Sequence, residues 1–252
     1  MHRATKCLAT LSFTLSLGAG AAQAGAADPA NGECGPLALG TSRIMAMPRE
    51  AAAYGRAQHP ALGLQRGEVV LTFDDGPRPE STPLVLKALA RHCARATFFM
   101  NGEPLLRAPD LARELVAQGH TAAMHGFVHH HFPQLSPERQ LDDLRQMQQA
   151  YRQVFGTEPA AYRFPFLEET PPLREALAAA RITVFSVDVG VEDWLPDQTP
   201  AMLTERLIKR LQETGGGIIL LHDAQDQTAA ALPSMLQALQ HHGFKLVHLE
   251  WR

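Results

Sequence analysis

The sequence predicts an α/β fold, a distorted and incomplete β/α barrel of about seven strands. From residue 68 onward, apolar runs of strand length alternate with helix-like stretches, and this repetition indicates a parallel sheet. Several helix-like stretches open with a hydroxyl residue beside proline, which is typical of an N-cap followed by a helix start: Thr82-Pro83, Ser136-Pro137 and Thr199-Pro200. Glycines stand where three of the helices should end, at Gly119, Gly156 and Gly243.

The expected elements follow one another in a regular order. The apolar runs predict strands at 69–73, 96–100, 121–124, 161–164, 182–187, 217–221 and 244–249. Helices are expected at 82–92, 109–118, 137–154, 171–180, 199–213 and 228–242. Residues 67–252 therefore form one domain, and residues 25–66, rich in Ala, Gly and Pro, are expected to be an N-terminal extension that wraps or leads into it.

The first 24 residues have the pattern of a secretory signal peptide. A short basic start with Arg3 and Lys6 precedes an apolar stretch and the small-residue sequence "AQA" at 22–24. A membrane anchor is the alternative, but the apolar stretch is shorter than the ~20 residues needed to span a bilayer. We therefore expect a periplasmic or secreted protein with no stable membrane insertion after cleavage.

Charge and cysteine content narrow the class further. The full chain carries a formal charge of −3, and losing Arg3 and Lys6 with the signal peptide lowers it by two more. A mildly acidic domain without clustered basic residues is a poor partner for nucleic acid, and we expect a monomer. In an oxidising compartment Cys34 and Cys93 could form a disulfide, and two free thiols are the open alternative.

Polar titratable residues lie at or just after the ends of five of the predicted strands. In a β/α barrel the carboxyl ends of the strands meet at one mouth, where reactions take place. We therefore expect one cluster at that mouth, made of Asp74, Asp75, His125, His129, Arg163, Asp188, Asp193 and His222.

The spacing of His125 and His129 suits metal binding. Residues four apart on a helical turn share a face, so both imidazoles could bind one metal, although surface histidines are an equally ordinary explanation. One acid of the Asp74–Asp75 pair could complete a His2-Asp set, leaving the other to face a bound water. A simple turn at "DDGP" is the competing interpretation.

The remaining residues allow acid catalysis. His222 ends a buried strand, and a neighbouring Asp193 would raise the pKa of its imidazole and keep it protonated as an acid. Arg163 could pair with whichever aspartate does not bind metal. The alternatives are a structural histidine, an ordinary salt bridge, and plain core positions for Phe166, Trp194 and Leu220.

These residues resemble five short motifs of the polysaccharide deacetylases with a NodB-homology domain, family 4 of the carbohydrate esterases. "TFDDGP" at 72–77 matches the first motif fully, and "LLH" at 220–222 matches the fifth. The second, third and fourth resemble "HGFVH" at 125–129, "RFPFL" at 163–167 and "GVEDW" at 190–194. The resemblance covers about residues 67–250, and it implies a barrel of the NodB-homology type.

The resemblance also implies a role for each motif residue. Asp75, His125 and His129 would bind a divalent metal, with Zn2+ favoured over Co2+ or Ni2+. Asp74 would be the general base acting on a metal-bound water, oriented by Arg163, and His222 the acid tuned by Asp193. The backbone N–H of Phe166 would stabilise the oxyanion, and Leu220 and Trp194 would shape the pocket for the acetyl methyl group.

Three residues depart from the motifs. Gly126 replaces a usual Ser or Thr that braces the metal loop, and Leu167 replaces a usual Gly, which would narrow or reshape the groove. Gly190 stands where an Asp is usual, and we expect Asp188 to compensate for it. None of the three removes a metal ligand or a proton carrier.

The sequence thus favours a metal-dependent hydrolase that removes N-acetyl groups from an acetylated glycan such as peptidoglycan, a chitin-like polymer or poly-N-acetylglucosamine. An O-acetyl esterase of the xylan type, or another amide hydrolase, would use the same site. A non-catalytic carbohydrate-binding domain that kept the fold is the hypothesis from a different class.

Overall fold

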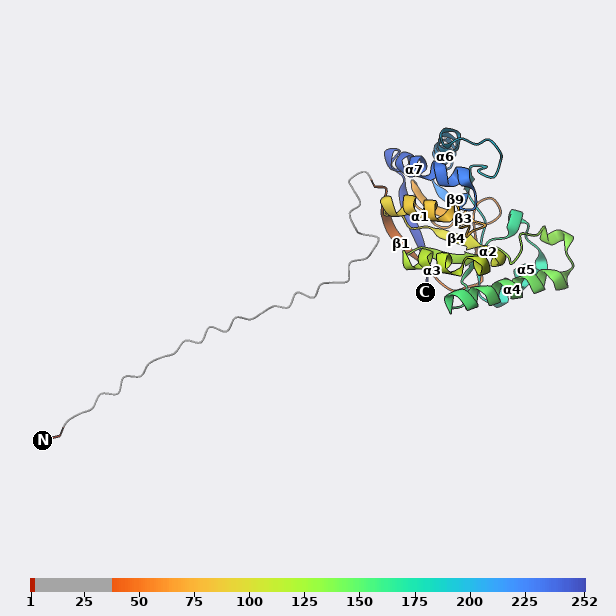
Figure 1. The fold of residues 1–252 in the computed structure, drawn as a ribbon, viewed down its shortest axis with the longest axis horizontal. Helices are drawn as coiled ribbons and strands as arrows, with labels where there is room; N and C mark the ends of the chain where they lie inside the picture. The colour runs from red at the N-terminus through yellow and green to blue at the C-terminus, as the bar shows by residue number, and fades with distance from the viewer. Residues whose placement is uncertain (3–37) are drawn as a thin grey trace.

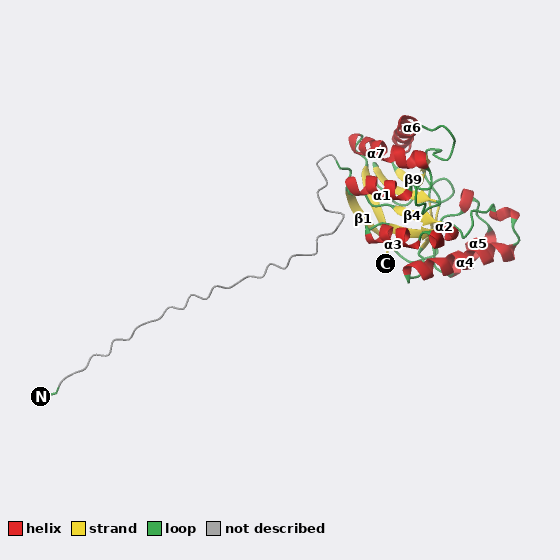
Figure 2. Ribbon diagram, viewed as in Figure 1, coloured by secondary structure: helices red, strands yellow, loops and turns green. Residues whose placement is uncertain are grey.

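In the computed structural model, which describes residues 1–2 and 38–252, helices surround a central sheet (Figure 1). Figure 2 shows the strands gathered in the middle of the domain and the helices on the outside. The helices α6 and α7 pack together at one end of the domain, and α2, α3, α4 and α5 lie along another side. This arrangement is that of a β/α barrel.

Every strand pair in the sheet is parallel. The order is β1-β10-β3-β4-β5-β6-β7-β2, with β9 pairing β3 and β8 pairing β9. The strands are β1 (Thr41–Met47), β2 (Ala53–Tyr54), β3 (Glu68–Asp74), β4 (Thr97–Met100), β5 (Thr121–Met124), β6 (Ala161–Tyr162), β7 (Thr183–Phe185), β8 (Val189–Gly190), β9 (Gly217–His222) and β10 (Lys245–Trp251). Among these described strands β7 and β8 do not pair, so the ring from β3 to β9 stays open there. The predicted distorted, incomplete barrel is confirmed.

Six of the seven α-helices in the described residues begin and end close to where the sequence places them, and the short helix α2 was not predicted. They are α1 (Thr82–Arg91), α2 (Gly102–Arg107), α3 (Pro109–Ala117), α4 (Pro137–Phe155), α5 (Pro171–Ala179), α6 (Pro200–Thr214) and α7 (Asp226–His241). The hydroxyls of Ser136 and Thr199 accept N-cap hydrogen bonds at α4 and α6, and Gly156 ends α4 with a φ of 69°. At α1 the N-cap is Ser81 instead of Thr82, whose hydroxyl donates to Asp223.

The N-terminal extension contributes strands that the sequence did not reveal. Its β1 pairs with the last strand, β10, and its β2 pairs with β7. These pairings are long-range, and neither strand shows strong alternation in sequence. Residues 3–24 of the predicted signal peptide and Cys34 lie outside the described residues, while Cys93 is disulfide-bonded.

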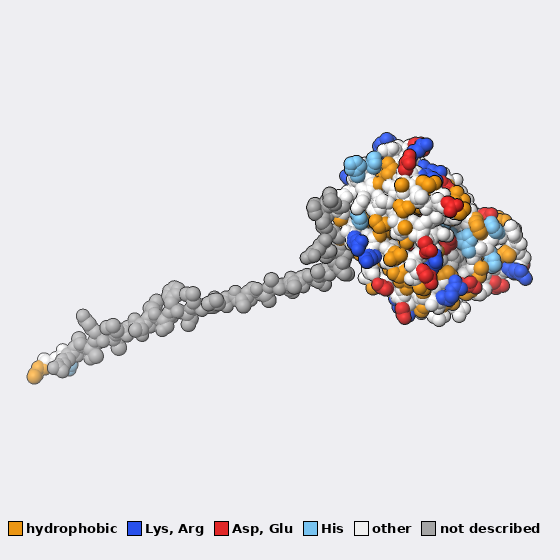
Figure 3. All heavy atoms as spheres, turned by 45° about the horizontal axis from the view of Figure 1, so that its top comes forward, with side chains coloured by type: hydrophobic (Ala, Val, Ile, Leu, Met, Phe, Trp, Pro, Cys, Tyr) orange, Lys and Arg blue, Asp and Glu red, His pale blue; other side chains and the backbone are white. Residues whose placement is uncertain are grey.

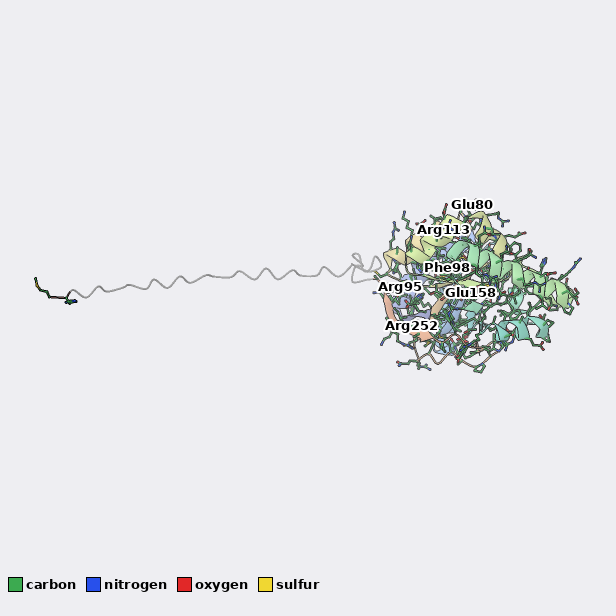
Figure 4. All side chains as sticks on the ribbon, turned by 90° about the horizontal axis from the view of Figure 1, so that it is seen from below. Glu80, Arg95, Phe98, Arg113, Glu158 and Arg252 are labelled. Atoms are coloured by element: carbon green, nitrogen blue, oxygen red, sulfur yellow. The ribbon has the colours of Figure 1, made fainter. Side chains whose placement is uncertain are left out.

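The alternation of side chains along β3 assigns each residue to one face of the sheet. Val69, Leu71 and Phe73 belong to the core between the sheet and the helices, and Val70 belongs to the core inside the barrel. Phe73 stacks on Phe98, which is buried in the body of the domain (Figure 4). Because successive strand residues face opposite sides, Asp74 shares the inner face with Val70 and is delivered to the barrel mouth.

One face of the domain carries charges of both signs. On the face in Figure 3, acidic and basic side chains are interspersed, without an extended basic patch. Among the described residues, no helix is both long and apolar enough to cross a membrane.

Two buried histidines make the stability of this fold depend on pH. Burial, together with the positive charge of Arg95, lowers the pKa of His120 to about 4 and that of His248 to about 3. The unfolded chain titrates near 6.5, so it binds more protons than the folded chain below that pH. Stability is therefore fully present above pH 6.5 and falls as the pH drops towards 4.

We predict that His120 and His248 each lower the free energy of unfolding, measured by urea titration, by roughly 2 kcal/mol between pH 7 and pH 5, and that the buried Asp223, whose pKa is raised to about 7, acts in the opposite direction. His248→Gln keeps a side chain that can bond to Thr121 but does not titrate, so its stability should depend less steeply on pH. Equal pH slopes for His248→Gln and the wild type would contradict this assignment.

Candidate active site

Two neighbouring strands bring an acid and a histidine to the same place. Residues of β3 and β9 pair in register along their length, and the last pair is Asp74 with His222. Ile219 and Leu221 face the helices, so Leu220 and His222 face the barrel interior together with Asp74. The register thus places these two side chains at the mouth.

Asp75 has a backbone conformation that turns its side chain away from that of Asp74. Its φ is 76°, in the left-handed region, and its N–H donates to the Phe99 carbonyl at the end of β4. The Asp75 Oδ1 atom lies 3.6 Å from His125 Nε2 and 3.4 Å from His129 Nε2. The three residues each offer one ligand atom, and these atoms lie within 4.8 Å of one another.

This trio fits a metal ion. Asp75 Oδ1 is buried and has no hydrogen-bond partner among the described residues. Metal-to-ligand bonds near 2.1 Å in tetrahedral geometry separate neighbouring ligand atoms by about 3.4 Å, close to the two distances observed. Two nitrogens and one oxygen are also the donor set of catalytic zinc sites that leave a position open.

The loop after β5 orients the two histidines. The Nδ1 atom of His125 donates to the Arg163 carbonyl at 2.8 Å, which leaves Nε2 unprotonated and available to a metal. Gly126 adopts a φ of 90°, and a Ser or Thr in this backbone conformation would be strained. The buried Asp143 accepts hydrogen bonds from the backbone N–H groups of Phe127 and Val128, so it braces the loop that carries the two histidines.

Burial also shifts the pKa values of these three residues in ways that favour a bound cation. It lowers the pKa of His125 and of His129, against the opposing influence of the nearby aspartates, and so favours the neutral imidazoles that bind metal. It raises the pKa of Asp75, because a buried carboxylate without a cation is poorly solvated.

Asp74 is held by Arg163 instead. Arg163 is fully buried and donates through Nη1 to Asp74 Oδ1 at 2.7 Å and to the Thr72 hydroxyl at 2.8 Å. The second oxygen of Asp74, Oδ2, lies 3.7 Å from His125 Nε2. One oxygen is therefore fixed by the guanidinium, and the other faces the candidate metal site.

His222 pairs with Asp193. Its Nδ1 lies 2.8 Å from Asp193 Oδ1, and its backbone N–H donates to Asp193 Oδ2, which also accepts from Thr228. Burial lowers the pKa of His222, but the hydrogen bond and charge of Asp193, with the charges of Asp74 and Asp75, outweigh it and raise the pKa to about 9. Since Nδ1 is engaged, Nε2 is the nitrogen left for a substrate.

A cavity of about 490 Å³ connects these groups. Its walls contain all the residues predicted from sequence to touch substrate or metal, together with Phe164 and Leu167: Asp74, Asp75, His125, His129, Phe166, Trp194, Leu220 and His222. The exposed Phe166 and Trp194 stand at the rim, and the Trp194 ring lies 5.3 Å from that of His222 in an edge arrangement. The plain core alternative therefore fails for these two aromatic residues, while Leu220 is buried and still lines the cavity.

One prediction of this cluster was wrong. Asp188 lies at the other end of β9, where its carboxylate accepts from the backbone N–H groups of Arg56 and Ile218. It therefore does not compensate for Gly190 beside Asp193. The Gly190 segment is instead held by Arg210, whose guanidinium donates to the Gly190 carbonyl at 2.6 Å and pairs with Glu192.

The structure adds a buried acid to which sequence reasoning gave no role. Asp223 accepts a hydrogen bond from Thr82, and its main-chain carbonyl accepts one from Ser81. Its carboxylate lies against Gly76, where a Cβ would come within 2.0 Å of Oδ2. Asp223 thereby ties the Asp75 turn to the His222 strand, and its place directly after His222 was the only available signal.

Comparisons with known proteins agree with this geometry. The polysaccharide deacetylase family model matches residues 63–185. A chitooligosaccharide deacetylase of Sinorhizobium fredii is 35% identical over 202 residues, which cover 73% of this chain and 91% of that protein. A solved structure of a Bdellovibrio bacteriovorus peptidoglycan deacetylase superposes with a TM-score of 0.74 at 27% identity, over 84% of this chain and 60% of that one.

Other relatives are longer than the matched region. A peptidoglycan-N-acetylglucosamine deacetylase of Listeria monocytogenes is 30% identical over 185 residues, which are 72% of this chain but 38% of that protein. This chain therefore spans well under half of the Listeria protein.

The geometry predicts different effects for the two adjacent acids on metal content. Asp75→Asn and His125→Ala should each lose most of the bound metal after purification and dialysis, because each removes a ligand atom. Asp74→Asn should keep metal near the wild-type level, because Asp74 is held by Arg163. Metal analysis of the purified proteins checks this, and loss of metal in Asp74→Asn with retention in Asp75→Asn would reverse the two assignments.

Proposed function

Because this chain belongs to the polysaccharide deacetylase family, we propose that it hydrolyses N-acetyl groups on an acetylated glycan, with peptidoglycan and chitin-type polymers of N-acetylglucosamine as its substrate class. The observation that carries the proposal is the convergence of three groupings on one cavity. These are the Asp75–His125–His129 trio, the Asp74–Arg163 pair and the His222–Asp193 pair.

The trio would hold a divalent metal, with Zn2+ as the ion that its donor set suits best and Co2+ or Ni2+ as substitutes. Such an ion would polarise the acetyl carbonyl and lower the pKa of a water beside it. Asp75 is suited to hold the ion because its Oδ1 is otherwise unpartnered.

Asp74 is the proposed general base. Arg163 fixes one carboxylate oxygen and leaves the other facing the trio, so Oδ2 can accept a proton from the attacking water. The backbone N–H of Phe166, at the cavity wall, is the proposed donor to the oxyanion.

His222 is the proposed general acid. Its imidazolium, maintained by Asp193, donates the Nε2 proton to the leaving amine as the C–N bond breaks. Leu220 and Trp194, which both line the cavity, would enclose the acetyl methyl group.

We also propose that the protein acts outside the cytoplasm, in the periplasm or as a secreted monomer. Peptidoglycan and chitin lie outside the cytoplasm, and residues 1–24 have the pattern of a cleaved signal peptide.

Acetate release tests the proposed reaction. The purified protein with added Zn2+ should release acetate from peptidoglycan, chitooligosaccharides or poly-N-acetylglucosamine, and a chelator should abolish the release until Zn2+ is restored. Release from acetylated xylan alone would favour an O-acetyl esterase. Binding of a glycan without release from any substrate would favour a non-catalytic carbohydrate-binding domain.

The pH profile tests the acid. The imidazolium is required, so kcat/KM should fall as the pH rises through the pKa of His222, which is about 9 and is lowered by a bound cation. In Asp193→Asn the supporting charge is lost and burial dominates, so this alkaline limb should move to lower pH. An unchanged alkaline limb in Asp193→Asn would contradict the role given to His222.

A further inference from the structure

The loop that carries Phe166 has a strained backbone. Phe166 and Leu167 have φ values of 54° and 58°, so two consecutive residues other than glycine occupy the left-handed region. Both side chains line the cavity. Glycine would relieve the strain at these positions but would remove the cavity wall, so the loop needs other contacts to hold its conformation.

One of those contacts comes from the N-terminal extension. Gln58 donates through Nε2 to the Leu167 carbonyl at 2.8 Å, and its Oε1 accepts from the Ser186 hydroxyl at 2.8 Å. The Ser186 carbonyl in turn accepts from Arg163, which binds Asp74. Gln58 therefore links the strained loop to the network that orients the proposed base.

The turn that presents Gln58 is well anchored. The backbone N–H groups of Gln58 and His59 both donate to the Gly55 carbonyl. Gly55 packs so closely on the chain just after β7 that a Cβ would come within 2.5 Å of the Ser186 backbone. Next to Gln58, His59 lies 2.5 Å from Glu169, which also pairs with Arg174, so the extension contacts the loop region at two points.

From these contacts we infer that Gln58 is a positioning residue of the active site, which holds the Phe166–Leu167 loop in its strained conformation and so aims the Phe166 N–H into the cavity. This inference rests on the proposed function for its catalytic consequence. Gln58 lies before residue 63, where the family match begins, so the family assignment gives it no role.

Replacing Gln58 should affect turnover more than folding. Gln58→Ala should lower kcat about tenfold, within the range seen when supporting residues around active-site groups are removed, and change KM little. Because Gln58 is exposed, Tm should stay near the wild-type value. Gln58→Glu keeps the acceptor for Ser186 but loses the donor to Leu167, so it should be equally slow. Gln65→Ala, an exposed glutamine of the same extension, is the matched control and should keep wild-type kcat.

A double-mutant cycle tests whether Gln58 acts through strain. Glycine adopts the left-handed conformation freely, so the effect of Gln58→Ala on kcat should shrink to less than about threefold in a Leu167→Gly background. An undiminished effect in that background would show that Gln58 does not act through the loop. Wild-type kcat in Gln58→Ala, or a kcat loss matched by a large fall in Tm, would also overturn the inference.

Hydrogen exchange separates this inference from the proposed function. The amides of Leu167 and Glu168 donate to the carbonyls of Phe164 and Pro165 in the wild type. A peptide covering 164–169 should exchange faster in Gln58→Ala than in the wild type or Gln65→Ala, whether or not any glycan is deacetylated. Equal exchange in all three proteins would overturn the positioning role, whereas faster exchange in a protein without activity would count only against the proposed function.

Discussion

The buried ion pair between Arg163 and Asp74 is the constraint on which the rest of the site depends. A guanidinium without solvent exposure is costly unless it is paired and hydrogen-bonded. Arg163 donates through its two Nη atoms to Asp74, the Thr72 hydroxyl and the Ser186 carbonyl, and it lies over the Phe99 ring, while its Nε has no hydrogen-bond partner among the described residues. These partners come from β3, from β4 and from the residue that follows β7. The Arg163 guanidinium therefore holds these elements together at the barrel mouth. Removing either Arg163 or Asp74 would leave an uncompensated buried charge.

This ion pair also gives the two adjacent aspartates different proposed roles. One carboxylate oxygen of Asp74 accepts a hydrogen bond from Arg163. The side chain of Asp75 is turned away by its left-handed backbone, and its Oδ1 has no hydrogen-bond partner among the described residues. Arg163 contributes to the trio as well, because its carbonyl accepts the Nδ1 proton of His125. One residue therefore orients the proposed base through its side chain and a proposed metal ligand through its backbone.

The departures from the family motifs have local physical explanations. Gly126 suits a backbone φ of 90°, and Asp143 braces the histidine loop. The Gly190 segment is held by Arg210 from α6, while Asp188 anchors the extension through Arg56. Leu167 keeps an apolar wall at a position where the backbone favours glycine, and the contact from Gln58 offsets that strain. In each case a residue from another element contacts the segment that departs from the motif.

Local signals in the sequence were enough for much of this protein. Apolar runs predicted the strands from β3 to β10 except the two-residue β8, and hydroxyl caps predicted the starts of α4 and α6. The motif "TFDDGP" and the histidine pair indicated the site residues. Each of these signals depends only on residues that are neighbours along the chain. The tertiary structure alone decided the pairing of β1 with β10, the position of Asp188 and the contacts of Asp143, Asp223 and Gln58. These depend on strand register and on contacts between residues far apart in the chain, for which no local pattern exists. The sequence determined which side chains could do chemistry, and the packing decided which of them meet.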